Sequence, residues 1–253
     1  MKQLFKALLP ASLLKKGQQI KGLLRDKRNE TRSAREVFSE IYKKGGWGGR
    51  GCSGSGSVTD TVTDPYIKTI SDYLQSIAPN KTIVDLGCGD MRVSSHLLRY
   101  CSKYIGVDVV PFLIEQHRST NWGRDRVRFQ CLDIAEDELP DGDICMLRQV
   151  LQHLSNKQIE KVLNKIQKYE ICLVTEHYPS DNPNIIPNKG MVHGGKIRLY
   201  QNSGVYLEEP PFSIWGDCVQ LMLEVPGVGM AQGFDQGVIR TYKIEFKRLD
   251  ESP

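Results

Sequence analysis

Two aspartates flank a glycine turn in the stretch KTIVDLGCGD, residues 81–90. Asp85 precedes the turn of residues 87–89, and Asp90 follows it. Glycines at such a turn permit positive φ, and without a Cβ they let backbone N–H groups approach a ligand. Two carboxylates beside bare backbone suit a ligand that carries a cationic amino group better than a pyrophosphate.

A third carboxylate, Asp108, ends the apolar run of residues 104–108 and lies 23 residues after Asp85. Residues 83–86 also form a short apolar run, so both stretches are expected to be buried strands of a parallel sheet. Helical spacing resumes after the glycine turn, which makes the order strand, turn, helix, strand. An acid at the tip of the second strand can accept hydrogen bonds from both ribose hydroxyls of an adenosine-type cofactor.

The sequence of the glycine turn distinguishes between two classes of cofactor. A dinucleotide site requires G-x-G-x-x-G, whose third glycine allows close packing under a pyrophosphate, but that position is Arg92 here. V-D-L-G-C-G-D followed by Y-I-G-V-D resembles the first two motifs of the class I S-adenosylmethionine (SAM) dependent methyltransferases. The resemblance implies SAM as the cofactor, with contacts at Asp85, Gly87, Cys88, Gly89, Asp90, Asp108, Val109, Asp133, Ile134 and Gln149. In that family the acid and apolar pair Asp133 and Ile134 sits at the adenine; the alternative is a strand-end turn or helix cap.

The elements that must position these residues alternate between strand and helix. This order predicts an α/β fold with a doubly wound, mostly parallel seven-stranded sheet, helices on both faces and an antiparallel last strand. A first helix is expected over 59–78, with Asp64 and Pro65 at its start. Strands are expected at 81–87, 104–108, 127–131, 142–147, 170–175, 219–225 and 238–246, the last as an edge strand; helices are expected at 90–101, 111–118 and 156–168.

Charge divides the chain of 253 residues into two parts. Residues 1–50 carry 13 Lys and Arg against 4 Asp and Glu, a net charge of +9, whereas residues 51–253 carry 21 against 26, or −5. We therefore divide the chain into a basic helical arm with a Gly/Ser-rich loop, 1–58, and a methyltransferase domain, 59–253. Residues 178–212 lose periodicity and gain Pro, Asn and Gly, which predicts a lid-like insertion.

The basic arm has apolar residues at helical spacing over residues 1–29. A signal peptide is disfavoured because Lys6 and Pro10 interrupt the apolar core. A helix on an anionic membrane surface at the inner face of the membrane is one alternative. A helix that packs on its own domain or on a second subunit is the favoured one. No apolar run is long enough to span a membrane, and the seven scattered cysteines are typical of a reduced, cytoplasmic protein without a metal site.

The loop of residues 45–57 is rich in glycine and contains Trp47. It could be a flexible linker, but a linker has no use for a tryptophan, so a functional loop is favoured. The pattern I-Y-x-x-x-x-W-G…S-G-S-G-S resembles the start of a group of bacterial small-molecule and surface-glycan methyltransferases. That resemblance makes Trp47 a candidate substrate contact.

Polar side chains follow the fourth and fifth strands, where an acceptor would lie beside the cofactor. His153 and His177 are the candidate general bases, because imidazole titrates near neutral pH. Glu176 comes directly before His177. Candidate substrate contacts are Trp47 and Glu176, with His193 and Arg198 in the insertion, where they could meet an anionic or hydroxylated substrate. Tyr206 is a further candidate, because Y-L-E-E-P-P-F resembles a feature of the same bacterial group.

These features predict a methyltransferase acting on a hydroxyl, or another heteroatom, of a small molecule, a sugar or a glycan precursor. The Asn/Asp-Pro-Pro-aromatic loop of enzymes that methylate exocyclic amines of nucleic acids is missing after the fourth strand, and the body is acidic, so nucleic acid is disfavoured. Two alternatives remain. One is an RNA methyltransferase tethered by its basic arm, and the other is a SAM-binding partner protein without catalysis.

Overall fold

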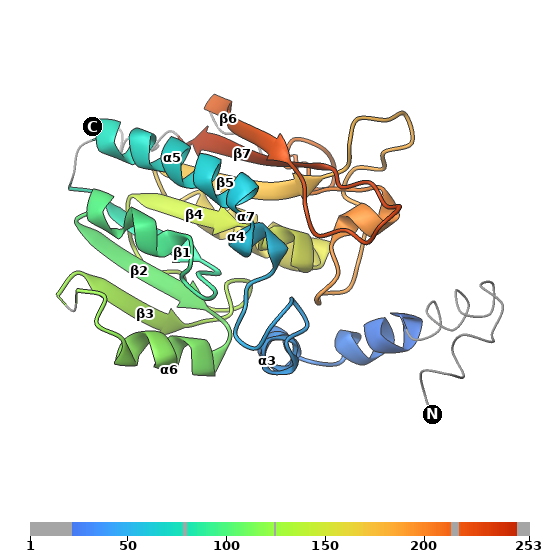
Figure 1. The fold of residues 1–253 in the computed structure, drawn as a ribbon, viewed down its shortest axis with the longest axis horizontal. Helices are drawn as coiled ribbons and strands as arrows, with labels where there is room; N and C mark the ends of the chain where they lie inside the picture. The colour runs from blue at the N-terminus through green and yellow to red at the C-terminus, as the bar shows by residue number, and fades with distance from the viewer. Residues whose placement is uncertain (1–21, 78–79, 124, 214–217, 247–253) are drawn as a thin grey trace, which may run out of the picture.

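The computed structural model describes residues 22–77, 80–123, 125–213 and 218–246. A seven-stranded sheet lies at its centre, in the order β3-β2-β1-β4-β5-β7-β6 (Figure 1). Neighbouring strands from β3 through β5 pair in parallel, and β7 is antiparallel to both β5 and β6. The predicted α/β fold is confirmed. The strands are β1 (Thr82–Leu86), β2 (Lys103–Asp108), β3 (Val127–Cys131), β4 (Ile144–Arg148), β5 (Ile171–Tyr178), β6 (Cys218–Pro226) and β7 (Val238–Glu245).

Helices cover both faces of this sheet (Figure 1). Successive residues of β1 point to opposite faces, so Ile83 packs with α5 and η1 while Val84 packs with α7. Both layers are apolar because a parallel sheet is buried on both sides. The helices are α3 (Ala34–Lys44), α4 (Ser55–Val58), α5 (Asp60–Ser76), α6 (Pro111–Ser119) and α7 (Asn156–Ile166), with short 3₁₀ helices η1 (Ser94–Tyr100), η2 (Leu151–His153) and η3 (Arg198–Gln201).

Three details of the predicted elements are wrong. β7 lies between β5 and β6, so the edge strand is β6. Asp64 and Pro65 do not start α5; it begins at Asp60, so Pro65 lies in its second turn. Val62, one turn before Pro65, is already buried, and this burial favours the earlier start. The helix expected over 90–101 is shorter, because Met91 adopts a φ of 61° and breaks the first turn.

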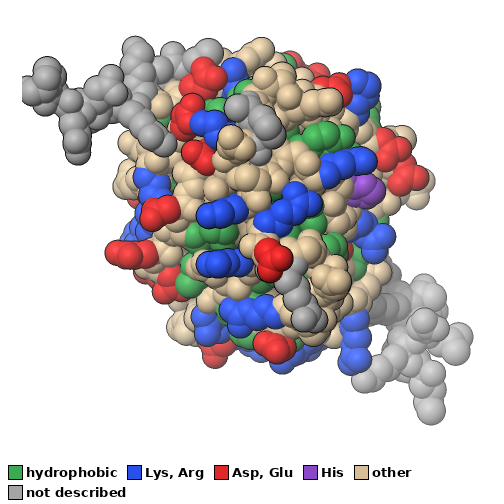
Figure 2. Space-filling view, turned by 90° about the vertical axis from the view of Figure 1, so that its left-hand side faces the viewer, with side chains coloured by type: hydrophobic (Ala, Val, Ile, Leu, Met, Phe, Trp, Pro, Cys, Tyr) green, Lys and Arg blue, Asp and Glu red, His purple; other side chains and the backbone are tan. Residues whose placement is uncertain are grey.

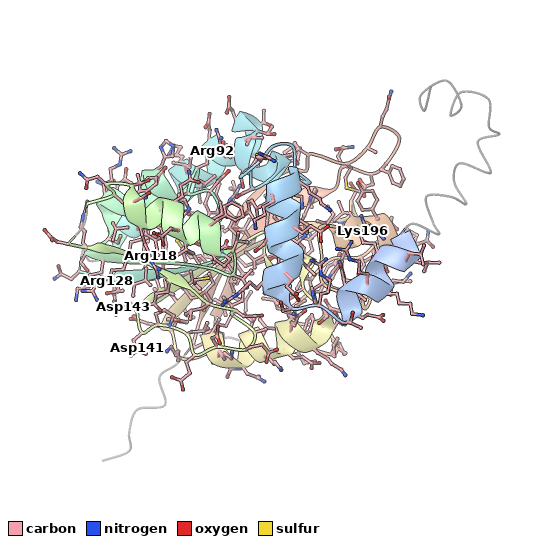
Figure 3. The ribbon with its side chains drawn as sticks, turned by 90° about the horizontal axis from the view of Figure 1, so that it is seen from below. Arg92, Arg118, Arg128, Asp141, Asp143 and Lys196 are labelled. Atoms are coloured by element: carbon pink, nitrogen blue, oxygen red, sulfur yellow. The ribbon has the colours of Figure 1, made fainter. Side chains whose placement is uncertain are left out.

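The segment before the sheet packs against it. Residues 22–30 are helical, and α3 follows with a capping box between Ser33 and Glu36. Phe38 and Tyr42 on one face of α3 join the apolar cluster that α7 forms with the strands. Figure 3 shows α3 between α6 and the helix of residues 22–30, with Lys196 beside that helix.

The described part of the arm contacts the insertion. Asn29 donates its Nδ2–H to the carbonyl of His193 at 3.1 Å, and Asp26 pairs with Lys196 at 3.2 Å. Residues 1–21 lie outside the described residues, and with them most of the expected membrane-surface helix. Within the described ranges, no helix has both the length and the apolar character needed to cross a bilayer.

Candidate functional site

A cavity of about 120 Å³ lies at the carboxyl ends of β1, β2 and β4. It brings together many of the predicted site residues from distant parts of the chain, namely Trp47, Asp85, Gly87, Cys88, Asp90, Asp108, Val109, Asp133, Ile134, Gln149 and His153. Sequence reasoning missed several residues that also line it, including Phe38, Tyr42, Ser53, Ser57, Arg92 and Arg148. Ser53 and Ser57 lie in the Gly/Ser-rich loop, and Arg148 is the last residue of β4, beside the cavity. These positions are the sequence features that could have identified the three residues.

Glycine is required in the turn after β1 because of close packing. Gly87 has a φ of 85°, and a Cβ there would lie 2.4 Å from Cγ2 of Val150. Gly89 has a φ of 54°, and its Cβ would lie 2.4 Å from Oγ of Ser53. Each position therefore excludes a side chain both by backbone conformation and by its neighbour.

The backbone N–H groups of this turn are already bound within the protein. Those of Gly87 and Cys88 donate to the carbonyl of Val107 at 2.8 and 2.9 Å. The expectation that the turn offers N–H groups to a ligand is therefore wrong for these two, and also for Gly89 and Asp90, which donate to Asp108 and Ser53. What the turn presents instead is the carboxylates that flank it.

Asp108 is held at the tip of β2 by two backbone donors. Its Oδ2 accepts from Gly89 N–H at 3.0 Å, and its Oδ1 accepts from Val110 N–H at 2.9 Å. Burial raises the pKa of Asp108 to about 6, although the two N–H donors lower it in part. Each carboxylate oxygen can accept a second hydrogen bond, so Asp108 retains room for two hydroxyl donors.

Asp85 lies deeper, at 2% exposure, and is held by hydroxyl groups. Its Oδ2 accepts from Ser94 Oγ at 2.5 Å and from Tyr104 Oη at 2.6 Å. Burial raises the pKa of this carboxyl too, against the effect of those two donors. Asp133 accepts from Ala135 N–H at 3.0 Å, so it makes the strand-end turn named as the alternative while also lining the cavity.

The Gly/Ser-rich loop is tied to the turn through Ser53. Ser53 N–H donates to Oδ2 of Asp90 at 3.1 Å, and Asp90 N–H donates to Oγ of Ser53 at 2.9 Å. The same Oγ lies 3.0 Å from the hydroxyl of Tyr42 on α3. The loop is thus a wall of the cavity in this structure rather than a free linker.

Arg148 ties the next part of the same loop to the end of β4. Its Nη2 donates to the carbonyl of Gly56 at 2.6 Å and its Nη1 to Oγ of Ser57 at 3.1 Å. Gln149 follows with a φ of 56°, an uncommon conformation for a residue with a side chain. The Gln149 side chain lines the cavity, and its buried Nε2 has no hydrogen-bond partner among the described residues.

His153 faces the cavity from η2 as a neutral imidazole. Its Nδ1 lies 3.1 Å from the carbonyl of Lys196, and a carbonyl can only accept, so Nδ1 carries the proton. Nε2 is then the acceptor nitrogen, and the amide Nε2 of Gln152 lies 3.5 Å from it. Burial lowers the pKa of His153 to about 4, and the Trp47 ring packs against it with centroids 5.0 Å apart.

Comparison with known proteins identifies the domain that holds this cavity. Residues 83–169 match the family described as a methyltransferase domain. This chain contains a methyltransferase domain. Over 90 residues it is 27% identical to phosphoethanolamine N-methyltransferase 1 of Arabidopsis thaliana, an alignment that covers 34% of this chain and 18% of that protein.

Two solved structures share the fold of this methyltransferase domain. One is the N-methyltransferase NodS from Bradyrhizobium japonicum WM9 in complex with S-adenosyl-L-homocysteine (SAH), with a TM-score of 0.52, 13% identity and coverage of 74% of this chain and 88% of that one. The other is a DhpI–SAH complex, with a TM-score of 0.53, 13% identity and coverage of 86% and 100%. At this identity the likeness concerns the fold.

Glu176 does not reach the cavity of the methyltransferase domain, contrary to the prediction of a substrate contact. Its carboxylate is fully buried and accepts three backbone N–H groups, from Val150 at 3.2 Å, Leu151 at 2.8 Å and Gln152 at 3.0 Å. Burial raises the pKa of Glu176 to about 8, and these donors lower it in part. The residue therefore holds the turn that leads into His153.

The other residues predicted in and after β5 are also turned away from the cavity. His177 points to the opposite side, where its Nε2 lies 2.6 Å from the carbonyl of Gln236. Arg198 is buried and donates to the carbonyl of Leu154 at 2.7 Å, and Tyr206 packs on Tyr178. His193 contacts Phe38, with ring centroids 6.4 Å apart, without lining the cavity.

The insertion of residues 178–212 therefore supports the site from outside. None of its residues lines the cavity, but Gly194 N–H donates to the carbonyl of His153 at 2.9 Å. Trp47 donates its Nε1–H to the carbonyl of Gly195 at 3.2 Å. The insertion thus fixes two residues of the cavity wall rather than covering the cavity with its own side chains.

The residues present fit an adenosine cofactor with an amino-acid group. Asp108 has free acceptor capacity at the strand tip, as two ribose hydroxyls require. Asp85 and Asp90 supply negative charge beside the turn, and the unpartnered Nε2 of Gln149 needs an acceptor that the described residues do not provide. Among the described residues, no group of three or more His, Cys, Asp and Glu side chains could hold a metal ion.

Proposed function

We propose that this protein transfers a methyl group from SAM to a hydroxyl, or another heteroatom, of a small molecule, a sugar or a glycan precursor. The observation that carries the proposal is that one cavity joins the carboxylate of Asp108 to the neutral imidazole of His153. The first suits a nucleoside, and the second suits removal of a proton from an acceptor.

The cofactor half of the cavity consists of the acids around the glycine turn. Asp108 would bind the ribose hydroxyls, Asp133 and Ile134 would contact the adenine, and Asp85 and Asp90 would lie toward the cationic amino group. SAM, when bound, supplies an electrophilic methyl group. The SAH complexes of NodS and DhpI, which share the fold, support this choice of cofactor.

The acceptor half includes an aromatic wall. Phe38 and Trp47 lie with ring centroids 6.1 Å apart, and Trp47 contacts the His153 ring. A flat or apolar ring face would pack against such a wall. His153 Nε2 would then exchange the Gln152 amide, 3.5 Å away, for the proton of an acceptor hydroxyl, because its Nδ1–H is held by the Lys196 carbonyl.

The basic arm favours a second candidate, an RNA methyltransferase with a tether. Residues 1–50 carry a net charge of +9, as such a tether would. Figure 2 views the amino ends of the strands, away from the cavity, and Lys and Arg there are interspersed with Asp and Glu rather than set in a continuous track. The cavity wall, too, includes more Asp than Lys and Arg. A small acceptor is therefore preferred.

The free thiols among the described cysteines fit a cytoplasmic protein.

The test is incubation of the full chain with SAM labelled in its methyl group and with cell extract separated into RNA, glycolipid and soluble metabolites. We expect label in the metabolite or glycolipid fraction. Label in RNA, lost at high salt or without residues 1–50, would establish the second candidate instead. SAM binding without transfer to any fraction would indicate a non-catalytic binding protein.

Two variants separate cofactor binding from chemistry. Asp108→Asn should weaken SAH binding by about tenfold or more, because charged hydrogen-bond acceptors are lost; Asp72→Asn, on the exposed side of α5, is the matched control. His153→Ala should lower turnover far more than SAH affinity, with exposed His96→Ala as its control. Equal turnover in His153→Ala and the native protein would remove His153 from the mechanism.

A further inference from the structure

Arg148 is fixed in place before any ligand binds. Its two terminal nitrogens donate to Gly56 and Ser57, and its guanidinium lies over the Tyr66 ring, 4.8 Å from the centroid. These contacts hold three sides of the group. An arginine fixed in this way loses little conformational freedom when it binds a further partner.

The charge of Arg148 is not paired within the described part of the chain. None of the Asp or Glu side chains described lies within 4.0 Å of its guanidinium nitrogens. Two of its five N–H groups are used, by Gly56 and Ser57, and its Nε is buried with no hydrogen-bond partner among the described residues. Buried charges in proteins are normally paired, so this arrangement calls for an anion.

The location of Arg148 points to a ligand in the cavity. Arg148 lines the cavity, and the next residue, Gln149, adds a second buried donor without a partner. Asp85 and Asp90 attract the Arg148 guanidinium only by longer-range electrostatic interaction, without a direct contact. Arg92 differs, because its side chain is 60% exposed and lies 3.8 Å from Asp90.

We propose that Arg148 and Gln149 form a seat for an anionic group, a carboxylate or a phosphate, of a molecule bound in this cavity. If the proposed function holds, the anion has one of two sources, and the choice between them rests on that function. One is the carboxylate of the amino-acid part of the cofactor. The other is an acidic group of the acceptor, which would narrow the acceptor to anionic small molecules or sugars.

The first experiment measures, by calorimetry, binding of SAH and of its decarboxylated counterpart to native protein, Arg148→Met and Arg118→Met. Arg118 is the matched control because it donates to the carbonyl of Phe129 from α6, outside the cavity (Figure 3). If the cofactor supplies the anion, native protein should prefer SAH by about 10-fold or more, as a charge-assisted hydrogen bond implies. Arg148→Met should lose that preference, and Arg118→Met should keep it.

The second experiment titrates acetate and inorganic phosphate into protein loaded with SAH. If the acceptor supplies the anion, native protein and Arg118→Met should bind one of these ions, and Arg148→Met should not. The seat is overturned if Arg148→Met matches native protein in both its preference for SAH and its binding of the two ions.

Two further variants distinguish anion binding by Arg148 from its role in holding the loop at Gly56 and Ser57. Ser57→Ala removes one contact that fixes Arg148 but keeps the cation, so it should weaken anion binding less than Arg148→Met does. Arg148→Lys keeps the charge without the planar fork and should bind the anion more weakly than native protein, which keeps the test open if Arg148→Met fails to fold. If native protein binds no SAH, the proposed function fails, while acetate and phosphate titration of the free protein still tests the seat.

Discussion

Ser53 and Asp90 bind each other twice, although 37 residues separate them in the chain. The backbone N–H of each donates to the side chain of the other, at 3.1 and 2.9 Å. The pair closes the Gly/Ser-rich loop onto the turn after β1. Because both residues line the cavity, the loop and the turn form one wall of it.

Ser53→Ala should open this wall. The substitution leaves Asp90 N–H and the Tyr42 hydroxyl without their shared partner, which should lower the free energy of unfolding by about 1 kcal/mol. SAH affinity should fall by a similar amount, about fivefold. Denaturant unfolding and calorimetry measure the two effects, and Ser95→Ala, whose hydroxyl binds the Arg92 carbonyl at 3.2 Å, is the control. No change in either quantity would show that the loop and turn are independent.

Gly89→Ala should be more damaging than Ser53→Ala, because the new Cβ meets Oγ of Ser53 at 2.4 Å and the backbone has a φ of 54°. The contact with Oγ disappears in the double variant Ser53→Ala/Gly89→Ala. The cost of Gly89→Ala, measured by denaturant unfolding, should therefore be smaller in the Ser53→Ala background than in the native one. If the losses of unfolding free energy from the two substitutions are strictly additive, the steric clash between the new Cβ and Ser53 Oγ is contradicted.

Glu176→Gln should loosen the turn that carries His153. Both oxygens of Glu176 accept backbone N–H groups, so a glutamine NH₂ would oppose one of those donors. We expect a loss of about 1–3 kcal/mol in the free energy of unfolding. Under the proposed function, turnover should fall further than SAH affinity, since the acceptor side is disturbed. Glu160→Gln, at an exposed position of α7, should leave all three quantities unchanged.

SAH binding should depend on pH through Asp108. The pKa of this carboxyl is raised to about 6, and its ionised form is the one that accepts ribose hydroxyls. Affinity should therefore be constant above pH 6 and fall by up to about tenfold per pH unit below it. In Asp108→Asn the affinity should be lower and flat over the same range, as calorimetry at several pH values would show.

The same carboxyl links pH to the stability of the free protein, with the opposite sign. Its pKa in the folded state lies above the ordinary value of 3.8, so its contribution to stability is present below pH 3.8 and is lost as the pH rises to about 6. Thermal unfolding of native protein and Asp108→Asn should diverge across that window. If the melting temperatures of the two proteins change in parallel over this pH range, a group other than Asp108 is responsible for the pH dependence.

The strand and turn around Asp85 and the tip of β2 at Asp108 could be predicted from the sequence alone. Buried parallel strands need continuous apolar runs, and the turn between strand and helix needs glycine, so both features are written in local residue types. The cavity accordingly contains the predicted Asp85, Asp90, Asp108 and Asp133.

Only the tertiary structure decided which polar residues past the strand ends face the cavity. His153 and Glu176 both lie near the carboxyl ends of neighbouring strands, yet one lines the cavity and the other binds three N–H groups beneath it. Arg148 was missed for the same reason. The direction of a side chain after a strand depends on the turn that follows and on segments packed against it, such as residues 53–57 and 194–198, which are remote in sequence.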